Sequence, residues 1–151
     1  MAAAMTGEAP AGQAGSVQTL ATAGTAYVRY EEALQRWRIG NDLIEQETAL
    51  TERGYLLHAF TDRAGKRTWI GDQTGSESNE LAVDYGVGLV TGASVRGGTE
   101  PSGSPGALRL ARVEANAAAP DAVEVVLWFA DDALGVEIGR HYLLYDGEPT
   151  I

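Results

Sequence analysis

The most apolar stretch of the chain is Val123-Glu124-Val125-Val126-Leu127-Trp128-Phe129, and it decides the fold class. β-Branched and aromatic residues dominate it, and it is too short for a typical helix. Turn-forming sequences flank it, with Pro120-Asp121 before it and Asp131-Asp132-Ala133-Leu134-Gly135 after it. The stretch therefore predicts a strand that is buried on both faces, with Trp128 in the core.

Outside this stretch, apolar residues recur with a period close to two, which is typical of strands. The one short helical turn that the pattern allows lies near Tyr30–Gln35. About six to ten strands at this spacing predict an all-β fold, an antiparallel β-sandwich. The other predicted strands are Arg36–Ile39, Leu43–Leu50, Tyr55–Thr61, Arg67–Ile70, Ala107–Ala115 and Val136–Tyr145. One or two further strands are predicted within Leu81–Val95.

Residues 1–26 differ in composition from the rest of the chain. Ala, Gly, Thr and Ser dominate them, and Glu8 is their one charged side chain. Interspersed glycines and Pro10 disfavour a helix, and the segment lacks the basic start and apolar core of a signal peptide. We therefore predict a disordered leader over 1–26 and one β-sandwich domain over 27–151.

Composition limits the partners that the chain can bind. With 11 basic and 21 acidic residues, its formal net charge is −10. This balance predicts no binding to nucleic acid or to anionic membranes, since both need clustered Lys and Arg. No apolar run is long enough for a transmembrane helix, and the absence of cysteine slightly favours the cytoplasm. We expect a soluble protein with no cofactor.

The sequence contains no recognisable catalytic or metal-binding motif. His58 and His141 are its only histidines and lie in different predicted strands, so no metal site is expected. Asp131 and Asp132 are adjacent in a turn, where Asp side chains commonly accept hydrogen bonds from backbone amides. The remaining acidic patch, Glu77, Glu80 and Asp84, has no calcium-loop spacing and is predicted to be solvated surface. We therefore predict no catalytic residue in this chain.

Aromatic side chains are the candidates for carbohydrate binding, because an indole ring packs on the apolar C–H face of a sugar. Trp37 and Trp69 lie beside predicted turns and are the two candidate carbohydrate-binding residues. Packing in the core is the favoured interpretation for each of them. Trp128 lies in the apolar stretch, so we expect it in the core.

The end of the chain suggests an interrupted hairpin. The segment Arg140-His141-Tyr142-Leu143-Leu144-Tyr145 runs into an Asp146-Gly147 turn, and Glu148-Pro149-Thr150-Ile151 then restarts the chain. We interpret this as a domain truncated at its C-terminal end, with the alternative that a complete chain frays there. An uncharged, unpaired strand over Tyr142–Tyr145 would promote self-association, so we also expect a homo-oligomer.

Two motifs carry a resemblance to a known family. Trp37-Arg38-Ile39-Gly40-Asn41-Asp42-Leu43-Ile44-Glu45, followed by strands as far as Arg67-Thr68-Trp69-Ile70, resembles the opening of α-galactosidase (melibiase-type) glycoside hydrolases. His141-Tyr142-Leu143-Leu144-Tyr145-Asp146-Gly147-Glu148-Pro149-Thr150-Ile151 resembles the strand pair that closes much of the same domain. The resemblance implies an N-terminal β-supersandwich that precedes a catalytic (β/α)₈ barrel. The catalytic aspartates of that family lie in the barrel, and no position of this chain corresponds to them.

Three classes of function follow from these observations. The first is a non-catalytic accessory β-sandwich of a multidomain glycoside hydrolase, which would support the missing C-terminal catalytic barrel and oligomer contacts. The second is a free-standing carbohydrate-binding module that uses Trp37 or Trp69. The third is a structural or assembly module that binds no ligand.

Overall fold

A computed structural model describes residues 16–70, 82–84, 89–91, 95–96 and 106–151. The one helical element among them is a short 3₁₀ turn, η1 (Glu32–Leu34), where the sequence predicted a turn near Tyr30–Gln35. The strands are β1 (Val17–Ala23), β2 (Ala26–Glu31), β3 (Arg36–Gly40), β4 (Ile44–Thr51), β5 (Gly54–Asp62), β6 (Arg67–Ile70), β7 (Ala82–Asp84), β8 (Leu89–Thr91), β9 (Val95–Arg96), β10 (Leu108–Ala119), β11 (Ala122–Asp131) and β12 (Val136–Tyr145).

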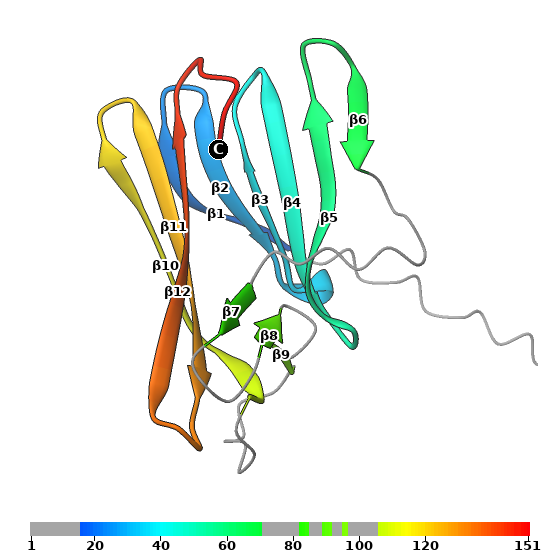
Figure 1. The fold of residues 1–151 in the computed structure, drawn as a ribbon. Coiled ribbons are helices and arrows are strands. Elements are labelled where there is room, and N and C mark those ends of the chain that lie inside the picture. The colour runs from blue at the N-terminus through cyan, green and yellow to red at the C-terminus, as the bar shows by residue number, and fades with distance from the viewer. Residues whose placement is uncertain (1–15, 71–81, 85–88, 92–94, 97–105) are drawn as a thin grey trace, which may run out of the picture.

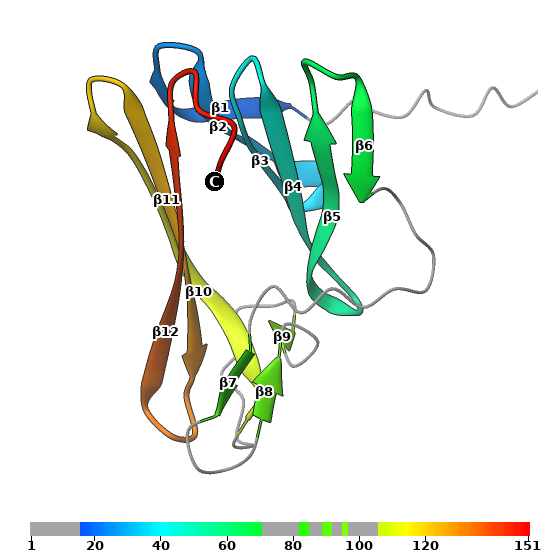
Figure 2. The same ribbon diagram turned by 45° about the horizontal axis from the view of Figure 1, so that its top comes forward.

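Two sheets face each other, as predicted for a β-sandwich (Figures 1 and 2). One sheet has six antiparallel strands in the order β1-β2-β3-β4-β5-β6, so each strand pairs with its neighbour in the chain. The other has the order β12-β11-β10-β9, in which the long strands pair antiparallel and β9 joins β10 in parallel over two residues. A small antiparallel pair, β7-β8, completes the described strands. The prediction of an all-β sandwich is confirmed.

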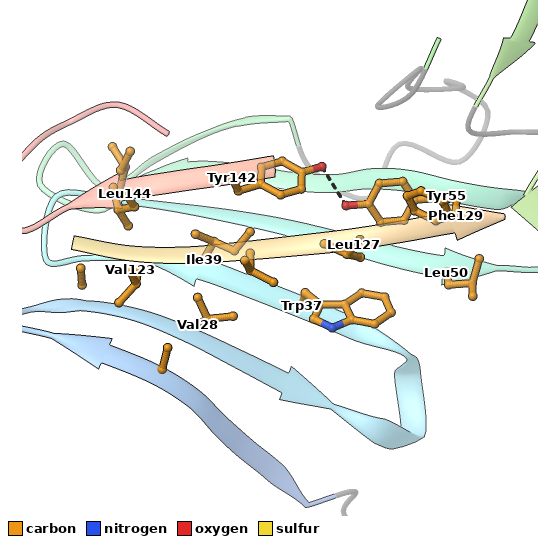
Figure 3. Packing of buried hydrophobic residues seen from close by; sticks show 14 of the residues in the cluster. Val28, Trp37, Ile39, Leu50, Tyr55, Val123, Leu127, Phe129, Tyr142 and Leu144 are labelled. Atoms are coloured by element: carbon orange, nitrogen blue, oxygen red, sulfur yellow. Dashed lines mark hydrogen bonds between the residues drawn. The ribbon is translucent and has the colours of Figure 1, made fainter. Parts of the chain in front are cut away.

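The core lies between the inner faces of the two sheets. From β11, Val123, Val125, Leu127 and Phe129 all point inward and are fully buried. They pack against side chains of the six-stranded sheet and of β12, including Val28, Trp37, Ile39, Leu50, Tyr55, Tyr142 and Leu144 (Figure 3). The apolar stretch that predicted the fold class therefore supplies the central strand of the core.

A hydrogen bond between two tyrosines crosses this core. The hydroxyls of Tyr55 on β5 and Tyr142 on β12 lie 2.7 Å apart, and both residues are buried (Figure 3). The Tyr55 ring also lies 5.1 Å from the ring of Phe129. Since a buried hydroxyl without a partner would destabilise the fold, this contact lets two large side chains fill the core and keep their polar ends satisfied.

The prediction that Trp128 lies in the core is wrong. In a strand, successive side chains point to opposite faces, and Leu127 and Phe129 already point inward. Trp128 is therefore on the outer face of the β12-β11-β10 sheet, where it is half-buried. Its ring lies under the Arg112 guanidinium, at 4.4 Å, and beside His141, at 6.1 Å between ring centroids. Gly139, opposite Trp128 on β12, leaves room for the indole.

The predicted leader over 1–26 is also wrong for its last ten residues. Residues 17–23 form β1, and Gly24-Thr25 turns the chain into β2. Ala21, Ala23 and Ala26 belong to the buried cluster, because small side chains suit the space between β1 and the strands β10 and β11 that it contacts. The turn needs a backbone with positive φ, which Gly24 supplies at +57°. Residues 1–15 lie outside the described part of the chain.

One hydrogen-bonded corner joins two motifs that are far apart in the sequence. Asn41, fully buried in the β3–β4 turn, accepts hydrogen bonds from the amides of Leu43 (2.9 Å) and Ile44 (3.0 Å) through Oδ1. Its Nδ2 donates to the carbonyls of Tyr145 (3.0 Å) and Glu148 (2.7 Å). A single carboxamide therefore holds the turn of one sheet and the end of β12 in the other. We call this contact the Asn41 corner.

Asp146 extends the Asn41 corner to two more turns. Its carboxylate accepts hydrogen bonds from the Thr25 amide, at 2.8 Å, and from the Thr25 hydroxyl. Its amide donates to the carbonyl of Asp121 in the β10–β11 turn, at 2.7 Å. These hydrogen bonds lower the pKa of the Asp146 carboxyl, because they favour its charged form. Figure 1 shows these turns together at one end of the sandwich.

Replacing Asn41 tests the importance of the corner. We expect Asn41→Ala to lower the free energy of unfolding by about 2–4 kcal/mol, since one buried and three part-buried backbone groups lose their partner, at roughly 1–3 kcal/mol for a fully buried group. Urea denaturation measures the change. Asn116→Ala, in the exposed part of β10, is the matched control and should stay within about 0.5 kcal/mol of wild type. Equal effects of the two substitutions would contradict this role of Asn41.

A second prediction concerns the glycine beneath Trp128. A Cβ atom at Gly139 would lie 3.0–3.1 Å from three carbons of the indole. We therefore expect Gly139→Val to lower the free energy of unfolding by about 1–3 kcal/mol, because the ring must move. In a Trp128→Ala background the same substitution should be neutral or stabilising. A double-mutant cycle measures this coupling, and simple additivity of the two substitutions would refute the close contact.

Candidate functional site

Of the two candidate carbohydrate-binding residues, Trp37 is in the core. Its side chain is 2% exposed and stacks on Tyr30 of β2, with ring centroids 5.0 Å apart and an interplanar angle of 28°. Figure 3 shows it among the buried side chains. At this exposure the indole has no open face on which a sugar could stack, so the candidate role is wrong and the favoured interpretation of core packing is confirmed.

Trp69 is accessible and lies beside a cleft, so the favoured interpretation of core packing is wrong for this residue. Its side chain is 54% exposed on β6, the last strand of the six-stranded sheet, and the Arg67 guanidinium lies 3.9 Å from its ring centroid. In both views of the fold, β5 and β6 extend to the side away from β10–β12 (Figures 1 and 2). A cleft of about 390 Å³ opens there, which we call the Trp69 cleft. It is lined by Leu43, Ile44, Phe60, Asp62, Ala64, Trp69 and Pro149.

The chemistry of the Trp69 cleft suits apolar contacts better than a sugar. The described residues of its lining are mostly aliphatic or aromatic, and Asp62 is the one ionisable side chain among them. Oδ1 of Asp62 accepts a hydrogen bond from the Gly65 amide at 2.7 Å, which fixes the β5–β6 turn. Sugar sites combine an aromatic platform with several polar groups that fix the hydroxyls. The Trp69 cleft has an aromatic ring that could serve as the platform, but its described lining has few polar groups that could bind sugar hydroxyls.

A second cleft opens between the sheets where β1–β3 face β10. It has a volume of about 400 Å³ and is lined by Leu20, Tyr30, Trp37, Leu110, Val113 and Ala115. Burial raises the pKa of the Tyr30 hydroxyl, and the nearby Glu32 carboxylate raises it further. A phenol with a raised pKa is a weaker acid and keeps its proton at neutral pH, so the described residues of this cleft bring together no acid–base pair.

The aspartates at the β11–β12 turn have structural roles, and Asp131 binds backbone amides as the sequence predicted. Asp131 is buried and accepts hydrogen bonds from the amides of Gly106 (2.6 Å), Ala133 (3.1 Å) and Leu134 (3.1 Å). Asp132 forms a two-pronged ion pair with Arg109, at 2.7 and 2.8 Å. Both carboxylates are therefore engaged in holding turns and strands.

The two histidines lie apart, each near a glutamate. His58 Nε2 is 4.0 Å from a carboxylate oxygen of Glu47 in the six-stranded sheet, and His141 Nδ1 is 3.3 Å from Glu124 in the other sheet. Among the described residues, no group of three His, Cys, Asp or Glu side chains could hold a metal ion. Of the predicted acidic patch, Glu77 and Glu80 lie outside the described residues, and Asp84 ends β7.

A polar cluster on the six-stranded sheet surrounds Tyr27. The Arg29 guanidinium lies 4.2 Å from its ring centroid, and Arg63 Nη1 donates a hydrogen bond to its hydroxyl at 2.7 Å. The Tyr27 hydroxyl donates in turn to the Glu45 carboxylate. Burial raises the pKa of Tyr27 to about 12, and Glu45 adds to this rise, while Arg63 and Arg29 oppose it. Such a phenol keeps its proton at neutral pH, so the cluster is structural.

Comparison with known proteins returned no matching family model, no matching curated protein and no matching solved structure. The resemblance to α-galactosidase-type hydrolases therefore depends on the two short motifs. In the structure these motifs meet, because Asn41 of the first binds the carbonyls of Tyr145 and Glu148 of the second. No helix of the described residues is long and apolar enough to span a membrane.

The raised pKa of Tyr27 predicts a loss of stability at alkaline pH. Below pH about 10, an ordinary tyrosine keeps its proton in both the folded and the unfolded state. Between about 10 and about 12 the unfolded chain releases the proton and the folded chain retains it, so stability falls as pH rises. Urea denaturation across this range should give a shallower pH dependence for Tyr27→Phe than for wild type. Equal pH dependences of wild type and Tyr27→Phe over this range would contradict the raised pKa.

Proposed function

We propose that this chain is a non-catalytic accessory β-sandwich of an α-galactosidase-type glycoside hydrolase, and that its Trp69 cleft packs on the catalytic barrel. The observation that carries the proposal is the exposed, mainly apolar Trp69 cleft. Aromatic side chains exposed beside apolar pockets are typical anchors of protein interfaces. The two motifs that resemble this family support the choice of partner.

The described residues also favour a non-catalytic role. Their aspartates in the β11–β12 turn bind backbone amides and Arg109, and the phenol of Tyr27 has a raised pKa. Hydrolysis of a glycoside needs an acid and a second carboxylate on either side of the scissile bond. Among the described residues that line the two clefts Asp62 is the one carboxylate, so these residues do not supply the pair.

A carbohydrate-binding module is the second candidate function. The observation that favours it is the open position of Trp69, with Asp62 lining the same cleft as a hydrogen-bond acceptor. Under this alternative a small sugar would stack on the indole face. Binding of melibiose or raffinose to the isolated chain, lost in Trp69→Ala, would favour this function over docking.

Trp69→Ala separates these functions. The reading frame beyond codon 151 is determined first, and we expect it to encode a barrel. In the isolated chain, Trp69→Ala should change the free energy of unfolding by less than about 1 kcal/mol, because the ring is exposed. In the protein that includes the barrel, it should weaken domain association by about 2–4 kcal/mol, as for a central interface aromatic. Calorimetry of both forms measures the difference.

Leu134→Ala is the matched control, because Leu134 is an exposed apolar residue in the β11–β12 turn. It should have a small effect in both forms. A frame that encodes no barrel, or equal effects of Trp69→Ala in the two forms, would overturn the docking proposal. Turnover of a nitrophenyl α-galactoside by the isolated chain would overturn the non-catalytic assignment.

A further inference from the structure

The second cleft, between β1–β3 and β10, interrupts the packing of the two sheets. We call it the inter-sheet cleft, and its volume is about 400 Å³. Apart from Trp37, each side chain of its lining is only partly buried, although all of them belong to the core or pack against it. The lining residues are Leu20, Tyr30, Trp37, Leu110, Val113 and Ala115. The apolar core therefore stays open at this place.

A bulge in each sheet builds this lining. Leu110 and Val113 of β10 are three residues apart and would point to opposite faces of a regular strand. The register of β10 shifts just after Leu110, and the extra residue lets both side chains line the cleft. A register shift in β1 likewise lets Leu20 line the cleft while its neighbour Ala21 is buried in the core. The apolar lining therefore depends on a bulge in each of the two facing strands.

One polar atom at the cleft has no hydrogen-bond partner. Trp37 is 2% exposed, and its indole Nε1 is buried without an acceptor among the described residues. Figure 3 shows this nitrogen on the edge of the ring that faces β2, the strand that carries Tyr30. A buried N–H group normally has a partner, because removing it from water without one is costly. The indole therefore brings an unused donor to an apolar cleft.

We propose that the inter-sheet cleft binds a small, neutral and mainly apolar molecule, and that an oxygen of this molecule accepts a hydrogen bond from Trp37 Nε1. Small-molecule sites typically have volumes of about 300–1,000 Å³ and apolar or aromatic linings with a few polar groups. The inter-sheet cleft has this size and this kind of lining. The inference concerns a different surface from the Trp69 cleft and does not depend on the function proposed above.

The lining determines the class of ligand. Its described side chains carry no charge that could neutralise an ion, and an ion would lose its hydration among them. The Glu32 carboxylate near the Tyr30 hydroxyl further opposes an anion. A sugar is also disfavoured, because its many hydroxyls would find only the Tyr30 hydroxyl and the Trp37 nitrogen among the described lining side chains. A neutral ketone, ester or ether of matching size meets these conditions.

Access to the nitrogen requires a shift of the lining, since solvent does not reach Nε1 of Trp37 in this structure. Tyr30 stacks on the indole with ring centroids 5.0 Å apart, and it is only partly buried. Leu20 is also partly buried and lies on β1, the edge strand of its sheet. Changes of side-chain rotamer are common on binding. The ligand would therefore meet the edge of the indole and not its face.

Acetophenone is a suitable probe, because it is neutral and has one carbonyl on an apolar ring. Ethylbenzene is the matched ligand without the oxygen. The three tryptophans give three indole N–H signals in a ¹H–¹⁵N NMR spectrum, and replacing each by phenylalanine assigns them. We expect acetophenone to move the Trp37 signal downfield in a saturable manner, because Nε1 gains an acceptor. Ethylbenzene should bind without this downfield shift.

Two substitutions test the position of the ligand and its hydrogen bond. Ala115→Leu fills the cleft, so acetophenone binding should be lost. Asn116→Leu, at the next position of β10 and on its exposed face, is the matched control and should leave binding unchanged. Trp37→Phe removes the donor and keeps a ring, so it should weaken acetophenone binding by about three- to tenfold more than ethylbenzene binding. Urea denaturation verifies that each variant is folded.

Three results would overturn the inference. The first is the absence of a saturable shift of the Trp37 signal up to the solubility limit of acetophenone, including the case in which only the Trp69 signal moves. The second is equal binding of acetophenone by wild type and Ala115→Leu, which does not require Trp37→Phe to fold. The third is an equal loss of affinity for acetophenone and ethylbenzene in folded Trp37→Phe.

Discussion

The carboxamide of Asn41 is the constraint on which the arrangement of the two sheets depends. It is fully buried and makes four hydrogen bonds, two within its own turn and two to the end of β12. Asparagine suits this position because one short side chain carries both an acceptor and two donors. A carboxylate would lack the donors, and an aliphatic side chain would leave buried backbone groups unsatisfied. The contact therefore fixes how the last strand meets the first sheet.

Local sequence signals predicted most of the described strands, their turns and the role of Asp131, because these depend on neighbouring residues. They could not predict which face of β11 points inward, since a continuous apolar run shows no alternation. The prediction for Trp128 was wrong because the inward face was not known. Gly139, eleven residues away in the sequence, leaves space for the indole on the outer face of the sheet. The first strand, β1, was missed because alanine has no marked preference for strands. Its small side chains nevertheless fit where β1 contacts β10 and β11.

The candidate site was predicted only in part, for a related reason. Trp37 and Trp69 have similar surroundings in the sequence, since each lies in a short predicted strand with an arginine and an isoleucine within two residues. Their difference is tertiary: Trp37 lies on an inner strand opposite the second sheet, and Trp69 lies on the edge strand β6. The lining of the Trp69 cleft also joins Leu43, Phe60 and Pro149 from three separate segments. Periodicity carries no information about such contacts.

The Trp69 cleft and the Asn41 corner differ in physical character. The cleft offers apolar side chains, whose attraction is non-directional and grows with the area removed from water. The Asn41 carboxamide makes hydrogen bonds, which demand partners at a defined distance and angle. The corner therefore fixes one arrangement of the two sheets, whereas the cleft accepts any apolar surface of matching shape. A net charge of −10 opposes loose association between copies of the chain, so this charge favours specific contacts over unspecific ones.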